Sequence, residues 1–280
     1  MRRHRIEYDG AIYHVIQRSS NKEKIFGQDK EKKRLLDIID QLKEKMFYKI
    51  FGYVIMDNHY HLLLQTGTIP LNKVMHRINF HYSKYYNNRH DRHGHVFGGR
   101  YKAGLIQDES YLFAVLRYVH QNPVRAGICT KVSDYSWSSD RAYRTNKNDL
   151  VDIELILNTL SINRKNAVVA YIKLMGEYDE VDFGKEKLIG DNEFVQSKKA
   201  EVMAENSNLG QVRATLSELL QECVATDEDR AQIRSGSRKR SLQEYKKRFA
   251  RDALKNGYTF KEIGTFMSIS DAAVNKLISK

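Results

Sequence analysis

Strand and helix patterns follow one another in a fixed order over residues 12–121, and that order leaves few folds open. Apolar and β-branched residues recur with strand periodicity in four segments and with helical periodicity in three. The strand patterns cover residues 12–16, 48–55, 59–65 and 96–106, and the helical patterns cover residues 30–45, 71–87 and 110–121. Pro123 predicts the end of the last helix. The order strand-helix-strand-strand-helix-strand-helix favours an α+β fold, with helices packed on one face of an antiparallel sheet.

The remaining chain divides by composition into two further regions. Residues 146–233 are helical by periodicity at 151–160 and 164–175, and the polar segment 179–191 predicts a loop. After a basic hinge, residues 241–256 predict a helix closed by Gly257. Thr259 with Glu262 has capping-box spacing for a second helix, and Ser270 could cap a third. Such short helices are typical of a helix-turn-helix DNA-binding domain, and a helical bundle with no DNA role would show the same pattern.

The net charge of +12 is unevenly divided over the 280 residues. Residues 1–145 carry 25 Lys and Arg against 14 Asp and Glu, residues 146–233 carry 10 against 17, and residues 234–280 carry 12 against 4. Two basic regions around an acidic one indicate two surfaces for a polyanion. A scattered, solvated surface would give the same totals.

Several classes of protein are excluded by composition. Apolar runs such as residues 62–64 are far too short to span a membrane. The basic residues 1–5 have no apolar stretch after them, which argues against a secretory signal. Two cysteines cannot form a disulfide framework, so we expect the reduced cytoplasm.

His59 and His61 alternate along a predicted strand. A period of two places both imidazoles on one face, about 7 Å apart along the backbone. Two convergent imidazoles are good ligands for a divalent ion. A pair of partly exposed sheet histidines would have the same spacing, so the pattern alone leaves both interpretations open.

The predicted helix 110–121 carries a possible nucleophile. Tyr118 and Asn122 lie four residues apart, on one flank of that helix. A phenol attacks phosphorus only if it loses its proton and the charge of the phosphate is offset, which a metal held by His59 and His61 could do. Tyr111 lies on nearly the same flank and competes as the nucleophile. Asn122 before Pro123 is also a suitable N-cap for a following turn.

Five motifs in the first 145 residues resemble the HUH single-tyrosine transposases, and most of all the branch associated with REP elements. The motifs lie at residues 10–15, 53–64, 98–102, 117–127 and 135–139, in the order of the family. The resemblance implies a ferredoxin-like catalytic domain that binds folded single-stranded hairpin DNA and cuts it with a tyrosine. It implies three domains: a catalytic domain over residues 1–145, an acidic helical extension over 146–233, and a helix-turn-helix domain over 234–280.

The resemblance also assigns roles to residues. His59 and His61 match the metal-binding pair, and Tyr118 matches the nucleophile. Asn122 falls where the wider superfamily often has a glutamine ligand, and its side chain is one methylene shorter. Family members use Mg²⁺ or Mn²⁺, whereas imidazole ligands alone would suggest Mn²⁺ or Zn²⁺.

The implied reaction is attack of Tyr118 on a DNA phosphodiester, which leaves a 5′-phosphotyrosine and a free 3′-hydroxyl. Attack by a second 3′-hydroxyl then transfers the strand without ATP. The expected phosphate contacts in this domain are Arg100, Lys102, Arg117 and Arg125.

The C-terminal region faintly resembles the helix-turn-helix domain of the bacterial replication initiator. Residues 237–240 and 260–264 carry this likeness, and residues 270–274 depart from it. We expect it to bind duplex DNA through Arg238, Lys239 and Arg240. The partners are therefore hairpin and duplex DNA and no membrane, in a monomer or homodimer associated with the nucleoid.

Two other functions are compatible with these residues. One is a domesticated, non-catalytic regulator that binds hairpin DNA or RNA, although such a protein has no need of His59, His61 and Tyr118 together. The other is a metal-dependent phosphodiesterase in which water attacks and Tyr118 positions the phosphate. Covalent attachment of DNA to the protein distinguishes the transposase from the phosphodiesterase, and the effect of His59→Ala on function distinguishes it from the regulator.

Overall fold

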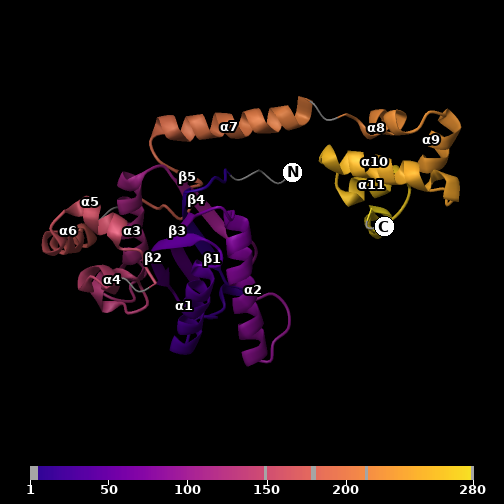
Figure 1. Cartoon of the computed structure of the whole chain (residues 1–280). Helices are drawn as coiled ribbons and strands as arrows, with labels where there is room; N and C mark the ends of the chain where they lie inside the picture. Colours follow the sequence, from indigo (N-terminus) through magenta and orange to yellow (C-terminus); the bar gives the residue numbers. More distant parts are fainter. Residues whose placement is uncertain (1–5, 148–149, 178–180, 212–213, 279–280) are drawn as a thin grey trace. The chain divides into compact units, whose positions relative to one another are not determined.

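The structure is a computed structural model that describes residues 6–147, 150–177, 181–211 and 214–278 (Figure 1). The chain forms two compact units, residues 1–200 and residues 201–280. The basic residues 1–5, which bear on the absence of a secretory signal, lie outside the described residues. In the described part of the chain, no helix combines the length and the apolar character needed to cross a membrane.

The first unit is built on a sheet whose strand order is β2-β3-β1-β4-β5. Its first four strands pair antiparallel with their neighbours. They are β1 (Ile12–Arg18), β2 (Tyr48–Ile55), β3 (His59–Thr66) and β4 (Lys102–Ile106), connected by α1 (Asp29–Lys43), the β2–β3 turn and α2 (Leu71–Arg89). This order is the ferredoxin-like arrangement, so the predicted α+β fold is confirmed. Short 3-10 turns lie at Ser20–Lys22 and Val132–Asp134.

Alternation along the strands separates two faces of this sheet. Tyr60 of β3 is buried and donates a hydrogen bond to Asn79 of α2 at 2.8 Å, so this side chain faces α2. The flanking residues His59 and His61 point to the opposite face. Helix α3 (Glu109–Arg125) covers that opposite face, where a Cβ added to Gly52 of β2 would lie 2.5 Å from a methyl carbon of Leu116.

Helix α3 runs through the proline that the sequence predicts to end it. Asp108 caps its start by accepting hydrogen bonds from the backbone N–H of Ser110 and of Tyr111. Pro123 lies inside the helix, so the carbonyl of Val119 has no i+4 amide donor. The side chain of Asn122 donates to the carbonyl of Tyr118 at 2.8 Å and to that of Val119 at 3.5 Å. The predicted end at residue 121 and the N-cap interpretation of Asn122 are therefore wrong.

Residues that follow α3 extend the same unit with α4 (Asp140–Thr145), α5 (Glu154–Leu160), α6 (Arg164–Gly176) and β5 (Leu188–Ile189). The long helix α7 (Asn192–Gln211) begins in this unit and continues past residue 200, where the second unit starts (Figure 1). Buried His120 of α3 lies 2.6 Å from the hydroxyl of Ser139 and 2.8 Å from that of Tyr171, which joins α3 to α6. The predicted helices over 151–160 and 164–175 correspond to α5 and α6.

The segment predicted as a loop over residues 179–191 contains a strand. Residues 188–189 form β5, which pairs parallel with β4. Residues 179–180 lie outside the described residues. A two-residue strand is too short to show periodicity, so the prediction of a continuous loop is wrong for a reason that sequence patterns do not reveal.

The second unit has its own buried core, which includes Leu220, Ile233, Phe249, Ile263 and Val274. Its helices are α8 (Leu216–Cys223), α9 (Asp227–Arg234), α10 (Gln243–Lys255), α11 (Phe260–Phe266) and α12 (Asp271–Ile278), with a 3-10 turn at Arg240–Leu242. The predicted caps are present: Gly257 has a φ of +80°, Thr259 and Glu262 form the capping box, and Ser270 accepts a bond from the amide of Ala273. The division by packing into two units differs from the three regions drawn from charge. The helix-turn-helix function stays a prediction.

Candidate active site

Three histidines lie on the α3 face of the sheet. The register pairs Ile16 with His61 and His14 with Leu63, so His14 and His61 are diagonal neighbours across β1 and β3. The Nε2 atom of His14 lies 2.8 Å from the Nδ1 atom of His61. The rings of His59 and His61 are 5.1 Å apart between centroids. The two predicted metal ligands are thus adjacent, together with a histidine to which the sequence assigned no role.

These imidazoles are held in the neutral form. Burial lowers the pKa of His14 and of His59 to about 4, with a smaller contribution from Arg18 at His59. The pKa of His61 lies well below its ordinary value because of burial first, and then because of His14 and His59. A metal binds a neutral imidazole through the lone pair of one nitrogen, so the electrostatics of this cluster suit a ligand.

The positions of the nitrogen atoms test whether an ion would fit. The Nδ1 atom of His59 lies 2.7 Å from the side-chain oxygen of Asn58, which leaves Nε2 as the nitrogen with the lone pair. The Nε2 atom of His61 is buried and has no hydrogen-bond partner among the described residues. Within the described ranges, no group of three or more His, Cys, Asp or Glu side chains is placed to hold a metal. The two imidazoles fit a divalent ion, and Asn122 as a third ligand stays a prediction.

Tyr118 lies beside this cluster. Its ring centroid is 5.7 Å from that of His14 and 6.1 Å from that of His61, both edge-on. Tyr111, the competing nucleophile, is half-buried against the core, and no ring contact with either histidine is found in the described residues. The spacing along α3 therefore brings Tyr118 to the histidines.

The proton of Tyr118 is held by a segment far away in the sequence. The Tyr118 hydroxyl donates to Asp182 Oδ1 at 2.8 Å, and the Phe183 ring meets the Tyr118 ring edge-on at 5.7 Å. Burial first, and then Asp182, raises the pKa of Tyr118 to about 12. The same hydrogen bond lowers the pKa of Asp182. No sequence signal identified Asp182, because it lies in a polar segment 64 residues from Tyr118.

Two of the predicted phosphate-binding arginines contact the chain itself. The Arg125 guanidinium lies over the Tyr118 ring, 5.0 Å from its centroid, and donates to the carbonyl of Val181. Arg117 forms an ion pair with Glu177 at 2.8 Å. Arg125 is thus beside the candidate nucleophile, whereas the Arg117 side chain is largely buried in an ion pair.

Basic side chains line a hollow at the end of β1 where Arg18 pairs with His59 of β3. Its lining comprises Ile16, Gln17, Arg18, Gly98, Gly99, Arg100 and Lys102. The predicted residues Arg100 and Lys102 are both exposed. Arg18 pairs with His59 in the β1–β3 register, and the sequence analysis missed it because one arginine after a strand carries no distinctive pattern.

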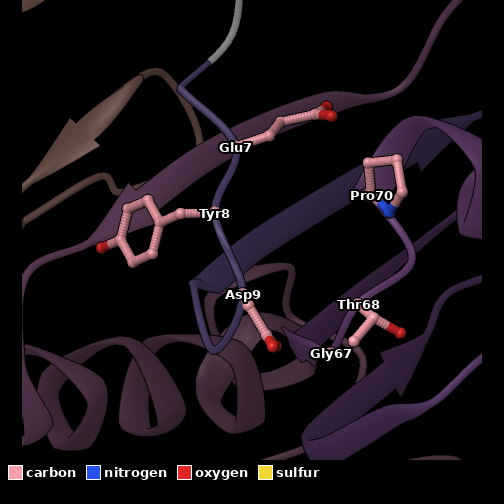
Figure 2. Close-up of a pocket in the computed structure, with 6 residues that line it drawn as sticks. All are labelled: Glu7, Tyr8, Asp9, Gly67, Thr68 and Pro70. Atoms are coloured by element: carbon pink, nitrogen blue, oxygen red, sulfur yellow. The ribbon is translucent and has the colours of Figure 1, made fainter.

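A second hollow lies at the other end of β3. Figure 2 shows its lining: Glu7, Tyr8, Asp9, Gly67, Thr68 and Pro70. It follows Thr66, the end of β3 opposite to His59, and carries two carboxylates. Acidic side chains repel a polyanion, so this hollow is not a candidate for DNA. In the second unit, Arg238, Lys239 and Arg240 are all exposed.

Comparisons with known proteins address the first unit. Residues 7–122 match the family model described as "Transposase IS200 like". No curated protein matches the chain. Nine chains of solved structures match. One is a REP-associated tyrosine transposase bound to a REP hairpin, with a TM-score of 0.48 and 14% identity over 68% of this chain and 99% of that chain. Another is a candidate transposase from Deinococcus radiodurans R1, with a TM-score of 0.32 and 16% identity over 43% of this chain and 97% of that chain.

Proposed function

We propose, from the match of residues 7–122 to the IS200-like transposase family model, that the protein cuts and rejoins single-stranded hairpin DNA through Tyr118. One observation supports Tyr118 most: its phenol ring lies against the neutral imidazoles of His14 and His61 on the α3 face of the sheet. The same surroundings favour Tyr118 over Tyr111.

His59 and His61 would hold Mg²⁺ or Mn²⁺, each through its Nε2 atom. Such an ion would offset the charge of the DNA phosphate and favour loss of the phenol proton. The buried, unpartnered Nε2 atom of His61 supports this assignment. Asn122 Oδ1 is the proposed third ligand. The amide nitrogen of this side chain donates a hydrogen bond to the carbonyl of Tyr118, so the oxygen is the atom that would bind the ion.

The reaction starts at the hydrogen bond between Tyr118 and Asp182. The phenol proton leaves toward Asp182, and the Tyr118 oxygen forms a bond to phosphorus. The bond from phosphorus to the 3′ oxygen breaks, and this oxygen takes a proton from water, which regains one from Asp182. The products are a 5′-phosphotyrosine and a 3′-hydroxyl, and attack of another 3′-hydroxyl on the phosphotyrosine transfers the strand.

The basic groups around the site would bind the DNA backbone. Arg18, Arg100 and Lys102 share one hollow, and their positive charge complements a phosphate. Arg125 would balance the charge that develops on the Tyr118 oxygen, because its guanidinium already lies over that ring. Arg117 would contact phosphate only after its ion pair with Glu177 opens.

The second unit would bind duplex DNA through Arg238, Lys239 and Arg240. Their exposure on a basic segment before α10 supports this role. We further propose a location at the nucleoid, and both a monomer and a homodimer are compatible with the site.

A denaturing gel tests the proposed chemistry. Protein is incubated with 5′- and 3′-labelled single-stranded hairpins from the repeats of its own host, with Mg²⁺ or Mn²⁺. A covalent band that is lost in Tyr118→Phe and His59→Ala, and kept in Tyr111→Phe, is the expected result. Cleavage without a covalent band would favour attack by water. Tight binding with neither cleavage nor a covalent band would favour the regulator.

A further inference from the structure

His14 is a buried histidine that the proposed chemistry does not use. It projects from β1 between His61 and Tyr118, and its side chain is almost completely enclosed. Its Nε2 atom lies 2.8 Å from Nδ1 of His61, at hydrogen-bond distance.

We propose that His14 is a positioning residue that accepts the Nδ1 proton of His61 and thereby keeps the Nε2 atom of His61 as a lone pair for the metal ion. This inference rests on the proposed function, because it assigns a role toward the same ion. It concerns which of two nitrogens 2.8 Å apart, Nε2 of His14 or Nδ1 of His61, carries the proton that they share.

The two nitrogens of His61 determine which residue donates the shared proton. Two neutral imidazoles whose nitrogens are 2.8 Å apart share one proton between them. If Nε2 of His14 accepts that proton, then Nδ1 of His61 is the donor and the lone pair of His61 lies on its Nε2 atom. That atom is the one that is buried and has no hydrogen-bond partner among the described residues.

The opposite direction leaves a donor without an acceptor. If Nε2 of His14 donated to His61, then the proton of His61 would lie on its own Nε2 atom. That atom is buried and without a partner among the described residues, so an N–H there would have no acceptor. A buried N–H without an acceptor lowers the stability of the folded state. It would also place a proton at the position where the cation is proposed to bind.

His14 also lies beside the candidate nucleophile. Its ring meets the Tyr118 ring edge-on at 5.7 Å, and the Tyr118 hydroxyl donates to Asp182, which accepts a second bond from the amide of Gly184 at 2.9 Å. A change at His14 is therefore tested by metal affinity and by the proton position of His61, and not by cleavage alone. Hydrogen-bond partners of a ligating histidine typically change metal affinity by about 10–100-fold when removed.

Two readouts on the full chain test the proposal. The first is the ¹⁵N NMR spectrum of the His61 ring in the metal-free protein, which reports the protonated nitrogen directly. The second is the Kd for Mn²⁺ without DNA, measured by electron paramagnetic resonance of the free ion. The variants are His14→Leu, which has no acceptor, and His14→Gln, whose side-chain oxygen can accept the proton. His120→Leu is the matched control, because it removes a buried histidine away from the site.

We expect His61 of the wild type to carry its proton on Nδ1. In His14→Leu the proton moves at least partly to Nε2, and Mn²⁺ binding weakens about 10–100-fold. His14→Gln and His120→Leu remain within a few-fold of the wild type. Equal thermal unfolding midpoints for His14→Leu and His120→Leu separate the effect from general loss of stability.

The results that would overturn the proposal differ in whether they also reject the proposed metal site. A wild-type His61 with its proton on Nε2, or a His14→Leu variant that binds Mn²⁺ as tightly as the wild type, rejects the role of His14 alone. Wild-type protein that binds Mn²⁺ no more tightly than His59→Ala rejects the proposed metal site as well.

Discussion

At the scale of single residues, the site is defined by which side chains carry a proton. Buried histidines remain neutral near pH 7, and Tyr118 keeps its proton through Asp182. His59 and His61 could be predicted as a pair because strand alternation is a local pattern. His14 and Asp182 could not, because they reach the site through the register of β1 on β3 and through a segment far along the chain.

The buried His120 makes the first unit sensitive to acid. Burial lowers its folded-state pKa from 6.5 to about 4, so the unfolded chain binds a proton first as pH falls. Its contribution is therefore present above pH 6.5 and is lost between pH 6.5 and about pH 4, by up to about 3 kcal/mol. Urea unfolding followed by Trp137 fluorescence at pH 7.5 and 4.5 should show a smaller loss in His120→Gln than in wild type. The exposed His76→Gln control should lose as much as wild type, and an equal loss in His120→Gln would contradict the account.

Asp182 accepts the phenol proton of Tyr118 in a hydrogen bond and is, after burial, the main cause of the raised pKa of Tyr118. Asp182→Asn should lower that pKa from about 12 toward its ordinary value. ¹³C NMR titration of tyrosine labelled at Cζ measures this shift, with Tyr118→Phe identifying the signal. Glu186→Gln, in the same segment, should leave the titration unchanged. An unaltered titration in Asp182→Asn would show that the hydrogen bond does not form in solution.

Secondary-structure elements decide which residues meet, and their ends were harder to predict than their existence. The order of strands and helices up to α3 follows from periodicity, and the capped helices α10 and α11 follow from Gly257 and Thr259. The continuation of α3 beyond Pro123 depends on hydrogen bonds from the Asn122 side chain, which no local pattern reveals. Strand β5 depends on β4 as its partner, and no signal for it lies within its own two residues.

Pairing of β5 with β4 positions the segment that contacts Tyr118. A Cβ added to Gly104 would lie 2.7 Å from the carbonyl oxygen of Glu186 and 2.9 Å from a carbon of Ile189. Gly104→Ala should therefore separate the two strands at a cost of about 1–3 kcal/mol. Hydrogen exchange should accelerate at the amides of Leu105 and Gln107, which donate to Lys187 and Ile189.

Gly176→Ala is the matched control for this change. A Cβ at Gly176 meets no atom within 4 Å, so the variant should exchange like the wild type. Unchanged exchange at Leu105 in Gly104→Ala would mean that β5 is not needed to position residues 181–184.

At the scale of the whole molecule, the chain has two packing units with separate cores. The acidic region 146–233 contributes to both units. Charged residues lie mostly on the surface, so a change in charge along the chain does not mark where one apolar core ends and the next begins. The sequence shows the change in charge along the chain, but it could not show that α5 and α6 pack in the first unit.

Separate units predict separable binding of two DNA forms. Changing Arg238, Lys239 and Arg240 together to Glu should weaken duplex binding and lower the slope of log Kd against log salt by up to about 3. Hairpin cleavage should be unchanged, because the proposed active site lies in the first unit. Fluorescence anisotropy over a salt series measures the slope, and the control changes the exposed Lys165, Lys173 and Lys187 of the first unit to Glu. A loss of hairpin cleavage without a loss of duplex affinity would contradict this division.

The central claim is that Tyr118 becomes covalently bound to DNA. The most direct measurement is tandem mass spectrometry of peptides from the protein after reaction with its hairpin and Mn²⁺ and digestion of the DNA. A nucleotide attached through phosphate to Tyr118, and absent from His59→Ala, is the predicted result. Attachment to Tyr111, or cleaved DNA with no modified tyrosine, would contradict it.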